Sequence, residues 1–343
     1  MITVLVVDDS ALVRALLSEM IDNHPLLTLV GAAANAFIAK RMVNELKPDV
    51  ITLDVEMPEV NGLVFLDRLM KARPTPVVMF SSLTEQGALA TMEALALGAV
   101  DFLPKPKLDI ANKVKEFEQE LTDKILLASQ AKLDIMPTST QTVRNVSEVS
   151  NLSLVAIGAS TGGTEAIRHI LMELPKSFPA VVVSQHMPKG FTQSFAQRLN
   201  SLCQLTVVEA TQGQPIKQGH VYIAPGDYHL EIQDTNDGYK IKLSQTDKVN
   251  NHRPSIDVMF NSVAQIAGRR AAGVLLTGMG KDGAQGLAQM KQAGGETIAQ
   301  SEASCLIYGM PKEAVRIGAA SQQKDLADIS SALYQWARLK SLK

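Results

Sequence analysis

A serine stands at the tip of a glycine-rich turn in the second half of the chain. Ser160 lies within Gly158–Gly163, which follows the apolar run 152–157 and precedes the helical pattern at 164–167. This order predicts a strand, a tight turn and a helix, with the hydroxyl beside the N–H groups of the helix start. Such a position suits an acyl-transfer nucleophile, and taken alone it suits a phosphate-cradling loop equally well.

A serine nucleophile needs a base, and the base needs an orienting partner. His186 follows the apolar run Ala180–Ser184, and Asp282 lies in the glycine-rich loop Gly278–Gly283 after a third apolar run. Loops at the carboxyl ends of parallel strands meet at one edge of a sheet. Ser160, His186 and Asp282 are therefore predicted to meet, although their chain order differs from that of the α/β-hydrolases.

Two pairs of residues are weaker candidates for this site. His252, in a polar loop, is a rival base, and Arg253 beside it has the guanidinium group that clamps acidic ligands. Both are candidate substrate-binding residues, and a helix-start turn at Ser255 explains them equally well. The backbone N–H groups of Thr161 and Met279 are candidate donors to an oxyanion.

A second set of chemical groups lies in the first part of the chain. Asp8 and Asp9 follow the first apolar run, and Asp54 follows the third. Carboxylates that converge at neighbouring strand ends favour a hard cation, and Mg²⁺ fits. Ser81 and Lys105 stand at the next strand ends. A carboxylate nucleophile, a divalent metal, a hydroxyl and a lysine are the groups needed to accept a phosphoryl group.

Alternating apolar runs and amphipathic helices must position these groups. Residues 1–107 hold five such strands, at Ile2–Val7, Leu27–Gly31, Val50–Leu53, Val77–Phe80 and Val100–Leu103. The helices between them are expected at Ala11–Ile21, Ala36–Leu46, Leu63–Lys71 and Ala88–Leu97. Continuous apolar strands separated by helices predict a parallel sheet covered on both faces, as in a doubly wound, flavodoxin-like α/β domain.

The second half shows the same alternation. A segment rich in Ser, Thr and Asn at 136–145 is typical of a linker. After it, strands are expected at Ala180–Ser184, Val221–Ala224, Leu230–Ile232, Ala272–Thr277 and Glu296–Ala299. Residues 204–243 favour hairpins with a turn at 236–238. We expect a doubly wound phospho-acceptor domain at 1–107, a helix and linker at 108–150, and a Rossmann-like, mostly parallel catalytic domain with an antiparallel portion at 151–343.

Composition excludes several classes of protein. The 343 residues carry a net charge of −2, so no overall field attracts nucleic acid or a membrane. No apolar stretch approaches the roughly 20 residues that span a bilayer, and the N-terminus begins with a strand and not a signal peptide. With only two cysteines, a cytoplasmic protein without direct membrane insertion is expected.

Two functions other than a serine esterase fit the sequence less well, because each requires residues that are not found. A DNA-binding output domain would need a basic recognition helix, which this chain lacks. A nucleotide-binding loop at Gly158–Gly163 would need an acidic residue about 20 positions further on, and it would leave His186 and Asp282 without a role.

Residues 1–107 resemble a response-regulator receiver domain. The resemblance rests on Val7–Ser10, Asp54–Pro58 with Gly62, Ser81 and Lys105–Pro106, and serine in place of threonine at position 81 is its one departure. It implies that Asp54 is the phospho-acceptor and that a sensor histidine kinase is the phospho-donor. It further implies that Mg²⁺ is held by Asp8, Asp9, Asp54 and the backbone carbonyl of Glu56, and that the phosphoryl group is sensed by Ser81, Lys105 and Phe102.

Five later segments are similar to the chemotaxis protein-glutamate methylesterase family: Gly158–Gly163, Gln185–Pro188, His252–Ser255, Gly278–Gly283 and Tyr308–Pro311. The resemblance covers the chain except for the linker. It implies hydrolysis of γ-glutamyl methyl esters on methyl-accepting chemotaxis receptors, with release of methanol, and in many members deamidation of receptor glutamines. Ser160 is then the nucleophile, His186 the general base and acid, and Asp282 the orienting residue, and the esterase reaction uses no cofactor.

The covalent link between a phosphorylation pocket and an esterase suggests gating. We expect the unphosphorylated first domain to cover the sheet edge that carries Ser160. A phosphoryl group on Asp54 adds charge, which biases a two-state element toward release.

Overall fold

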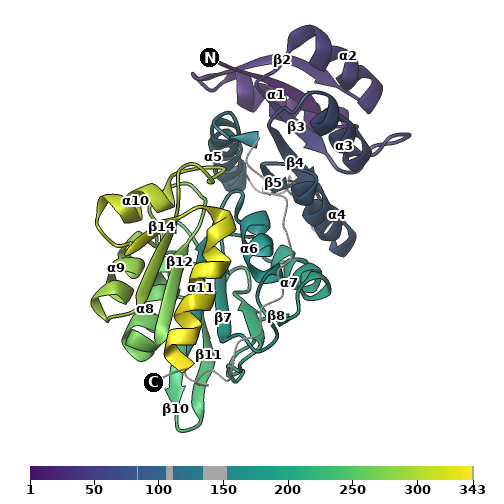
Figure 1. Ribbon diagram of the computed structural model, residues 1–343. Helices are drawn as coiled ribbons and strands as arrows, with labels where there is room; N and C mark the ends of the chain where they lie inside the picture. Colours follow the sequence, from purple (N-terminus) through teal and green to yellow (C-terminus); the bar gives the residue numbers. More distant parts are fainter. Residues whose placement is uncertain (83, 106–110, 134–152, 342–343) are drawn as a thin grey trace. The chain divides into compact units, whose positions relative to one another are not determined.

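Five strands and five helices alternate through the first of two units. The computed structural model describes residues 1–82, 84–105, 111–133 and 153–341, and the chain divides into the units Met1–Asp134 and Ile135–Lys343. The predicted linker at 136–145 lies outside the described residues. The first unit contains, in order, β1 (Ile2–Val7), α1 (Ala11–Asp22), β2 (Leu27–Ala33), α2 (Ala36–Leu46), β3 (Val50–Asp54), α3 (Gly62–Ala72), β4 (Val77–Ser81), α4 (Glu85–Ala96), β5 (Asp101–Pro104) and α5 (Ala111–Ala128) (Figure 1).

The strands of the first unit form one parallel sheet in the order β2-β1-β3-β4-β5. All residues of β3 and β4 are buried, as the continuous apolar runs predicted. The first four helices begin at capping side chains, which accept a hydrogen bond from a backbone N–H of the first turn: Ser10, Asn35, Asn61 and Thr84. The strand order reverses between β1 and β3, so the predicted crevice lies at their carboxyl ends.

The second unit is larger. Its elements are β6 (Leu154–Ala159), α6 (Gly163–Met172), β7 (Ala180–Gln185), α7 (Phe191–Leu202), β8 (Thr206–Glu209), β9 (His220–Ile223), β10 (His229–Thr235), β11 (Gly238–Ser244), α8 (Ile256–Ile266), a 3₁₀ turn (Gly268–Arg270), β12 (Ala271–Leu275), α9 (Ala284–Gln292), β13 (Glu296–Gln300), α10 (Met310–Arg316), β14 (Gln322–Lys324) and α11 (Leu326–Ser341).

Seven parallel strands form the main sheet of this unit, in the order β14-β13-β12-β6-β7-β9-β8. Helix α6 contacts α7 and α11, whereas α9 contacts α8 and α10. The order reverses at β6, which lies between β12 and β7, and ligands of such sheets bind at the carboxyl ends beside this point. The doubly wound fold predicted for both halves is confirmed.

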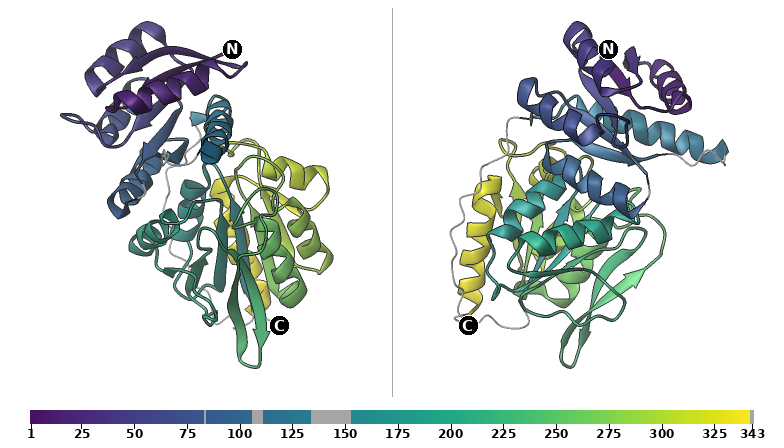
Figure 2. Two further views of the ribbon diagram at one scale, coloured as in Figure 1. Left: turned by 180° about the vertical axis from the view of Figure 1, so that it is seen from behind. Right: turned by 90° about the vertical axis from the view of Figure 1, so that its right-hand side faces the viewer.

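One part of the fold prediction was wrong. Strands β10 and β11 do form an antiparallel hairpin that extends from the unit (Figure 2), but β8 and β9 are parallel strands of the main sheet. The segment that joins them crosses to the hairpin, where Gly213 N–H donates to Ile241 O and Ile216 N–H donates to Tyr239 O. These bonds hold the connection against β11, so β9 returns parallel to β8. Within the described ranges, no helix is both long and apolar enough to cross a lipid bilayer.

Candidate active site

Three polar side chains meet at the carboxyl edge of the main sheet of the second unit. Ser160 follows β6, His186 follows β7, and Asp282 lies in the loop between β12 and α9. His186 Nδ1 lies 3.2 Å from Ser160 Oγ, and His186 Nε2 lies 2.8 Å from Asp282 Oδ2. Backbone hydrogen bonds join the loops, since Ser160 N–H donates to Thr277 O and His186 N–H donates to Ala159 O. The structure thus brings these three predicted residues together.

The environment of Asp282 determines which nitrogen of His186 is protonated. Burial alone would raise the pKa of Asp282, but its hydrogen bonds with His186 and Asn250 outweigh this effect and hold the pKa well below its usual value. An ionised carboxylate only accepts, so Nε2 of His186 carries the proton. Nδ1 is then left as the acceptor for the hydroxyl proton of Ser160, which is the tautomer that a general base requires.

Gly278 allows the loop after β12 to approach the serine closely. A Cβ at this position would lie 2.5 Å from Ser160 Cβ and 2.5 Å from Met310 Cε, and the φ of Gly278 is +155°. A Cβ on Gly309 would in turn lie 2.6 Å from Gly278 O. These distances are shorter than van der Waals contact, so only glycine fits at 278 without displacing Ser160 and at 309 without displacing Gly278.

The carboxyl ends of β1, β3 and β5 hold the second predicted site. Asp8, Asp9 and Asp54 each offer one oxygen, and these oxygens lie within 4.8 Å of one another. Lys105 Nζ lies 2.7 Å from Asp54 Oδ2 and 3.4 Å from Asp8 Oδ2. Burial raises the pKa of Asp54 to about 6 despite the opposing effect of Lys105, and burial also raises the pKa of Asp8.

This carboxylate pocket suits a small, hard cation. Asp8 Oδ2 and Asp54 Oδ2 are buried and face Lys105 Nζ, with no other hydrogen-bond donor to them in the described part of the chain. Buried carboxylates this close repel one another, and a cation that binds between them removes the repulsion. Oxygen donors of this kind are the ligands that Mg²⁺ prefers, so Asp8, Asp9 and Asp54 fit the ion that the sequence predicts.

The remaining predicted residues of the first unit surround this pocket. Ser81 Oγ donates to Gly87 O at 2.8 Å, so its hydroxyl is directed toward α4. Phe102 is buried in β5, and Lys124 Nζ lies 5.8 Å from the centre of its ring. Glu56, whose carbonyl is a predicted metal ligand, donates its N–H to Asp54 Oδ1 at 3.1 Å.

The sequence matches two known families. Residues 4–115 match the response regulator receiver domain, and residues 155–333 match the CheB methylesterase domain. The chain belongs to the CheB methylesterase family. Among curated members, a Shewanella oneidensis protein-glutamate methylesterase/protein-glutamine glutaminase is 53% identical, over 98% of this chain and 97% of that protein. One from Salmonella typhimurium is 49% identical, over 97% of this chain and 96% of that protein.

The structural comparison agrees with this CheB methylesterase assignment. The crystal structure of the Thermotoga maritima CheB methylesterase catalytic domain is 42% identical, with a TM-score of 0.53. The match covers 55% of this chain and 99% of that domain. The seven-stranded unit is therefore the CheB methylesterase domain of this chain.

The two predicted substrate-binding residues differ in their surroundings. In this CheB domain the His252 ring stacks on the His186 ring, with ring centres 3.6 Å apart and planes inclined by 12°. The guanidinium of Arg253 bonds Asp227 Oδ1 through Nε and Nη2, and its Nη1 donates to Gln245 O and Thr246 O. Arg253 thus ties the loop before α8 to the loop after β9, whereas His252 lies directly against the His186 imidazole.

The candidate oxyanion donors flank Ser160. Thr161 lies between Ser160 and Gly162, the residue that precedes α6. Met279 follows Gly278, its side chain is 49% exposed, and its N–H donates no hydrogen bond to any acceptor in the described part of this CheB domain. Thr161 thus follows Ser160 directly in the chain, and Met279 follows the glycine that approaches Ser160 closely.

Several residues that hold the triad of this CheB domain were not predicted from the sequence. The Gln185 amide donates to Ser160 O at 2.9 Å and to His186 O at 3.2 Å, so it links the backbone at these two triad residues. Asn250 and Ser255 donate to Asp282 Oδ1, each at 2.8 Å. The available signals were the position of Gln185 next to His186 and the Asn250-Asn251 pair, which is typical of a tight turn.

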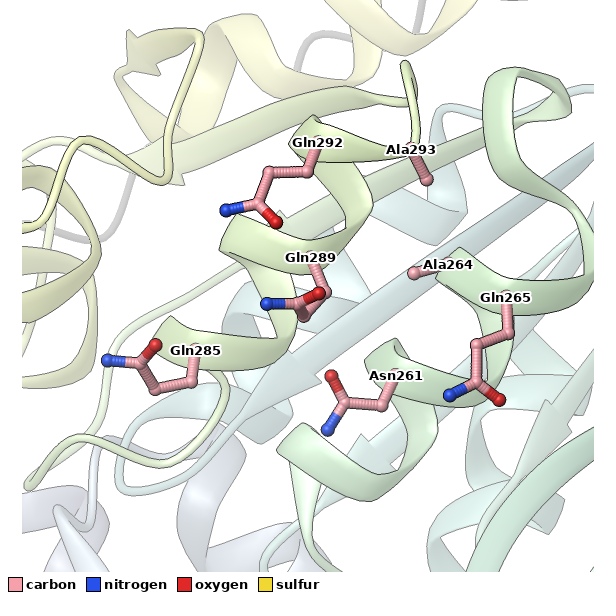
Figure 3. A pocket seen from close by; sticks show the side chains of 7 residues that line it. All are labelled: Asn261, Ala264, Gln265, Gln285, Gln289, Gln292 and Ala293. Carbon is pink, nitrogen blue, oxygen red and sulfur yellow. The ribbon is translucent and has the colours of Figure 1, made fainter.

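A separate pocket lies between α8 and α9 of the CheB domain. It has a volume of about 480 Å³ and includes none of the three triad residues (Figure 3). Five amide side chains line it: Asn261, Gln265, Gln285, Gln289 and Gln292. Because no titratable side chain lines it, we assign no chemistry to this pocket.

Proposed function

We propose that the chain is a phosphorylation-regulated protein-glutamate methylesterase that acts in the cytoplasm on methyl-accepting chemotaxis receptors. The observation that carries this proposal is the hydrogen-bonded series from Ser160 Oγ through His186 to Asp282, in a domain of the CheB methylesterase family. A serine, its base and an ionised orienting carboxylate are the groups that ester hydrolysis by acyl transfer requires.

The reaction proceeds in two steps. Ser160 Oγ attacks the ester carbonyl while His186 Nδ1 takes its proton, and the N–H groups of Thr161 and Met279 donate to the oxyanion that forms. The imidazolium returns the proton to the departing methoxide, so methanol leaves and the glutamyl acyl group stays on Ser160. His186 then takes a proton from the water that attacks the acyl-enzyme. The imidazolium returns this proton to Ser160 Oγ as the acyl bond breaks, which frees Ser160 and the γ-carboxyl group of glutamate. Asp282 stabilises the imidazolium in both steps.

The same groups support deamidation of glutamine. An amide presents the same carbonyl to Ser160, and His186 protonates the nitrogen as it leaves as ammonia. The acyl-enzyme is identical to the one formed from the methyl ester, so its hydrolysis also yields glutamate. We therefore include a protein-glutamine glutaminase activity in the proposal.

The esterase is tested by incubating the phosphorylated chain with receptor that carries radiolabelled methyl esters. Labelled methanol should appear, and one equivalent of a fluorophosphonate, which reacts with activated serine, should stop its release. Peptide mass mapping should then find the phosphonyl group on Ser160. Methanol release that continues after Ser160 is fully modified would contradict the mechanism.

Phosphorylation of Asp54 by a sensor histidine kinase is the proposed control. Asp8, Asp9, Asp54 and the Glu56 carbonyl would hold Mg²⁺, which neutralises charge on the transferred phosphoryl group. The Lys105 ammonium, 2.7 Å from Asp54 Oδ2, is placed to pair with the phosphoryl oxygens. Ser81 and Phe102 are the proposed sensing residues, and rotation of the Ser81 hydroxyl away from Gly87 O would free it to bond the phosphoryl group.

Asp54→Asn is expected to abolish the stimulation of methanol release by a small-molecule phospho-donor with Mg²⁺. Stimulation of the wild type should be about 5- to 150-fold, the usual range of coupling between two sites. Asp67→Asn is a matched control, because Asp67 is a surface residue of α3 that pairs with Lys71. Equal stimulation of the Asp54→Asn variant and the wild type would exclude Asp54 as the phospho-acceptor.

We further propose that the unphosphorylated receiver domain restricts access to Ser160. A fragment that lacks residues 1–140 should then match or exceed the methanol release of the phosphorylated full chain. The gating proposal is wrong if neither this deletion nor phosphorylation of Asp54 changes the rate.

A further inference from the structure

Asp282 caps helix α8 in addition to orienting His186. Ser255 precedes α8, but its hydroxyl makes no capping bond to its own helix and donates to Asp282 Oδ1 at 2.8 Å. The N–H of Ile256 donates to Asp282 Oδ2 at 2.7 Å, and the N–H of Asp257 donates to Oδ1 at 3.2 Å. The first N–H groups of α8 are thus satisfied by a carboxylate that lies just before α9.

Helix α9 receives its cap from α8 in return. Its own capping position is Gly283, which has no side chain to offer. Asp257, the second residue of α8, accepts the Gly286 N–H at 2.7 Å. The two helices therefore exchange caps, and the exchange buries the carboxylates of Asp257 and Asp282 near each other.

The amide of Asn250 lies between these two carboxylates. Its Nδ2 donates to Asp257 Oδ2 and to Asp282 Oδ1, both at 2.8 Å. Asn250 and Asn251 have φ values of +51° and +68°, and they form the two-residue turn between Val249 and His252, whose backbone N–H groups each donate to the other's carbonyl. Asparagine adopts this left-handed backbone more readily than most residues, so the turn can present an amide at this point.

Among the described residues, few other titratable groups lie close to the His186–Asp282 pair. His186 faces Asp282 directly, the His252 ring stacks on the His186 ring, and Lys281 is exposed beside Asp282 in the loop. His229 lies behind Ser255, whose N–H it accepts through Nδ1, while its Nε2 donates to Asp247 O. A ring that accepts at one nitrogen and donates at the other is neutral, so His229 adds no charge. Asp257 is therefore the like charge that Asn250 must separate from Asp282.

We propose that Asn250 and Asp257 are positioning residues of the esterase. The Asn250 amide bonds both buried carboxylates at once, and so keeps Asp282 ionised and directed at His186. Asp257 accepts the other hydrogen bond of that amide, and it caps α9 as Asp282 caps α8. This inference rests on the proposed function, because its effect is read at the Ser160 reaction.

The test measures methanol release by the full chain as a function of pH. Asn250→Ala is expected to lower kcat about ten- to hundred-fold with KM unchanged, the effect of losing one hydrogen bond to a buried charge. The acid limb of kcat/KM should move to higher pH, because the His186–Asp282 pair binds a proton more readily once the amide is gone. Adding Asp257→Asn to Asn250→Ala should restore part of kcat and move the acid limb of kcat/KM back to lower pH. The second substitution removes the neighbouring negative charge and keeps an oxygen that accepts the Gly286 N–H.

Asn251→Ala is the matched control, since Asn251 has the same left-handed backbone and an exposed side chain. It should behave as wild type. The contrary result is that Asn250→Ala and the double variant Asn250→Ala/Asp257→Asn differ from the wild type only in Tm, with the acid limb of kcat/KM at the same pH in all three. In that case Asn250 and Asp257 are merely structural and the inference is wrong.

The rate of phosphonylation of Ser160 by a fluorophosphonate separates this inference from the proposed function. If the wild type is phosphonylated but releases no methanol, the proposed receptor substrate is wrong. The phosphonylation rates of the variants would still show whether Asn250 and Asp257 position the triad. Phosphonylation of Asn250→Ala at the wild-type rate would overturn the positioning role alone.

Discussion

Replacing Ser160 with alanine is expected to lower kcat for methanol release from methylated receptor by about 10⁴-fold or more. Ser160 Oγ is the atom that forms the acyl bond, and in its absence His186 has only water to activate. The loss should be in kcat with little change in KM, since the hydroxyl contributes little to holding the receptor segment. Single-turnover release of labelled methanol, at receptor concentrations above KM, measures the effect directly.

Ser184→Ala is the matched control for this experiment. Ser184 is a fully buried serine two residues before His186, and its hydroxyl has no hydrogen-bond partner within the described residues. Its removal should leave the rate near that of the wild type. A Ser160→Ala variant that retains more than about a tenth of wild-type activity would show that another group is the nucleophile.

The second large effect is expected from Asp282→Asn, with kcat about 10³- to 10⁴-fold lower. An asparagine amide placed against His186 Nε2 donates a hydrogen bond, so the imidazole proton moves to Nδ1. Nδ1 then faces the hydroxyl of Ser160 as a donor and cannot take its proton. The substitution keeps the volume of the side chain, so the loss reports the tautomer and not a cavity.

Phosphorylation provides an internal control for the Asp282→Asn variant. Its Asp54 should still accept a phosphoryl group at the wild-type rate, which shows that the first unit is intact. Thermal unfolding of the second unit should be measured in parallel, because Asp282 also accepts the Ile256 N–H at the start of α8. A variant with normal KM, normal phosphorylation and wild-type kcat would remove Asp282 from the mechanism.

Much of the fold follows from local rules that can be read in the sequence. Continuous apolar runs predicted the buried parallel strands of both sheets, because only a strand covered on both faces lacks polar alternation. Two edge strands, β8 and β14, were not predicted. Strand β14 is Gln-Gln-Lys and has no apolar residue, since an edge strand packs little of its surface. The parallel return of β9 depends on backbone bonds from 213–216 to β11, which no local pattern reveals.

The residues of the proposed catalytic site also fall into two groups, those that could be predicted from the sequence and those that could not. Ser160, His186 and Asp282 were predicted to meet because loops at the carboxyl ends of parallel strands lie at one edge of a sheet, which is a topological rule. The contacts of Asn250, Gln185 and Asp257 arise from the packing of particular side chains, for which the sequence carries only weak local signals. Arg253 shows the limit of reading charge alone, because its guanidinium is used to join two loops.

The division of the chain into two units has a consequence for how such proteins can change. The triad and the residues that hold it lie between 154 and 300, while the carboxylate pocket and its lysine lie between 8 and 105. Every residue named above for either site lies within its own unit, so a recombination point between the units divides neither set of chemical groups. A different receiver could therefore be joined to this esterase without redesigning the catalyst, whereas the proposed control by phosphorylation would be kept only by a receiver that also restricts access to Ser160.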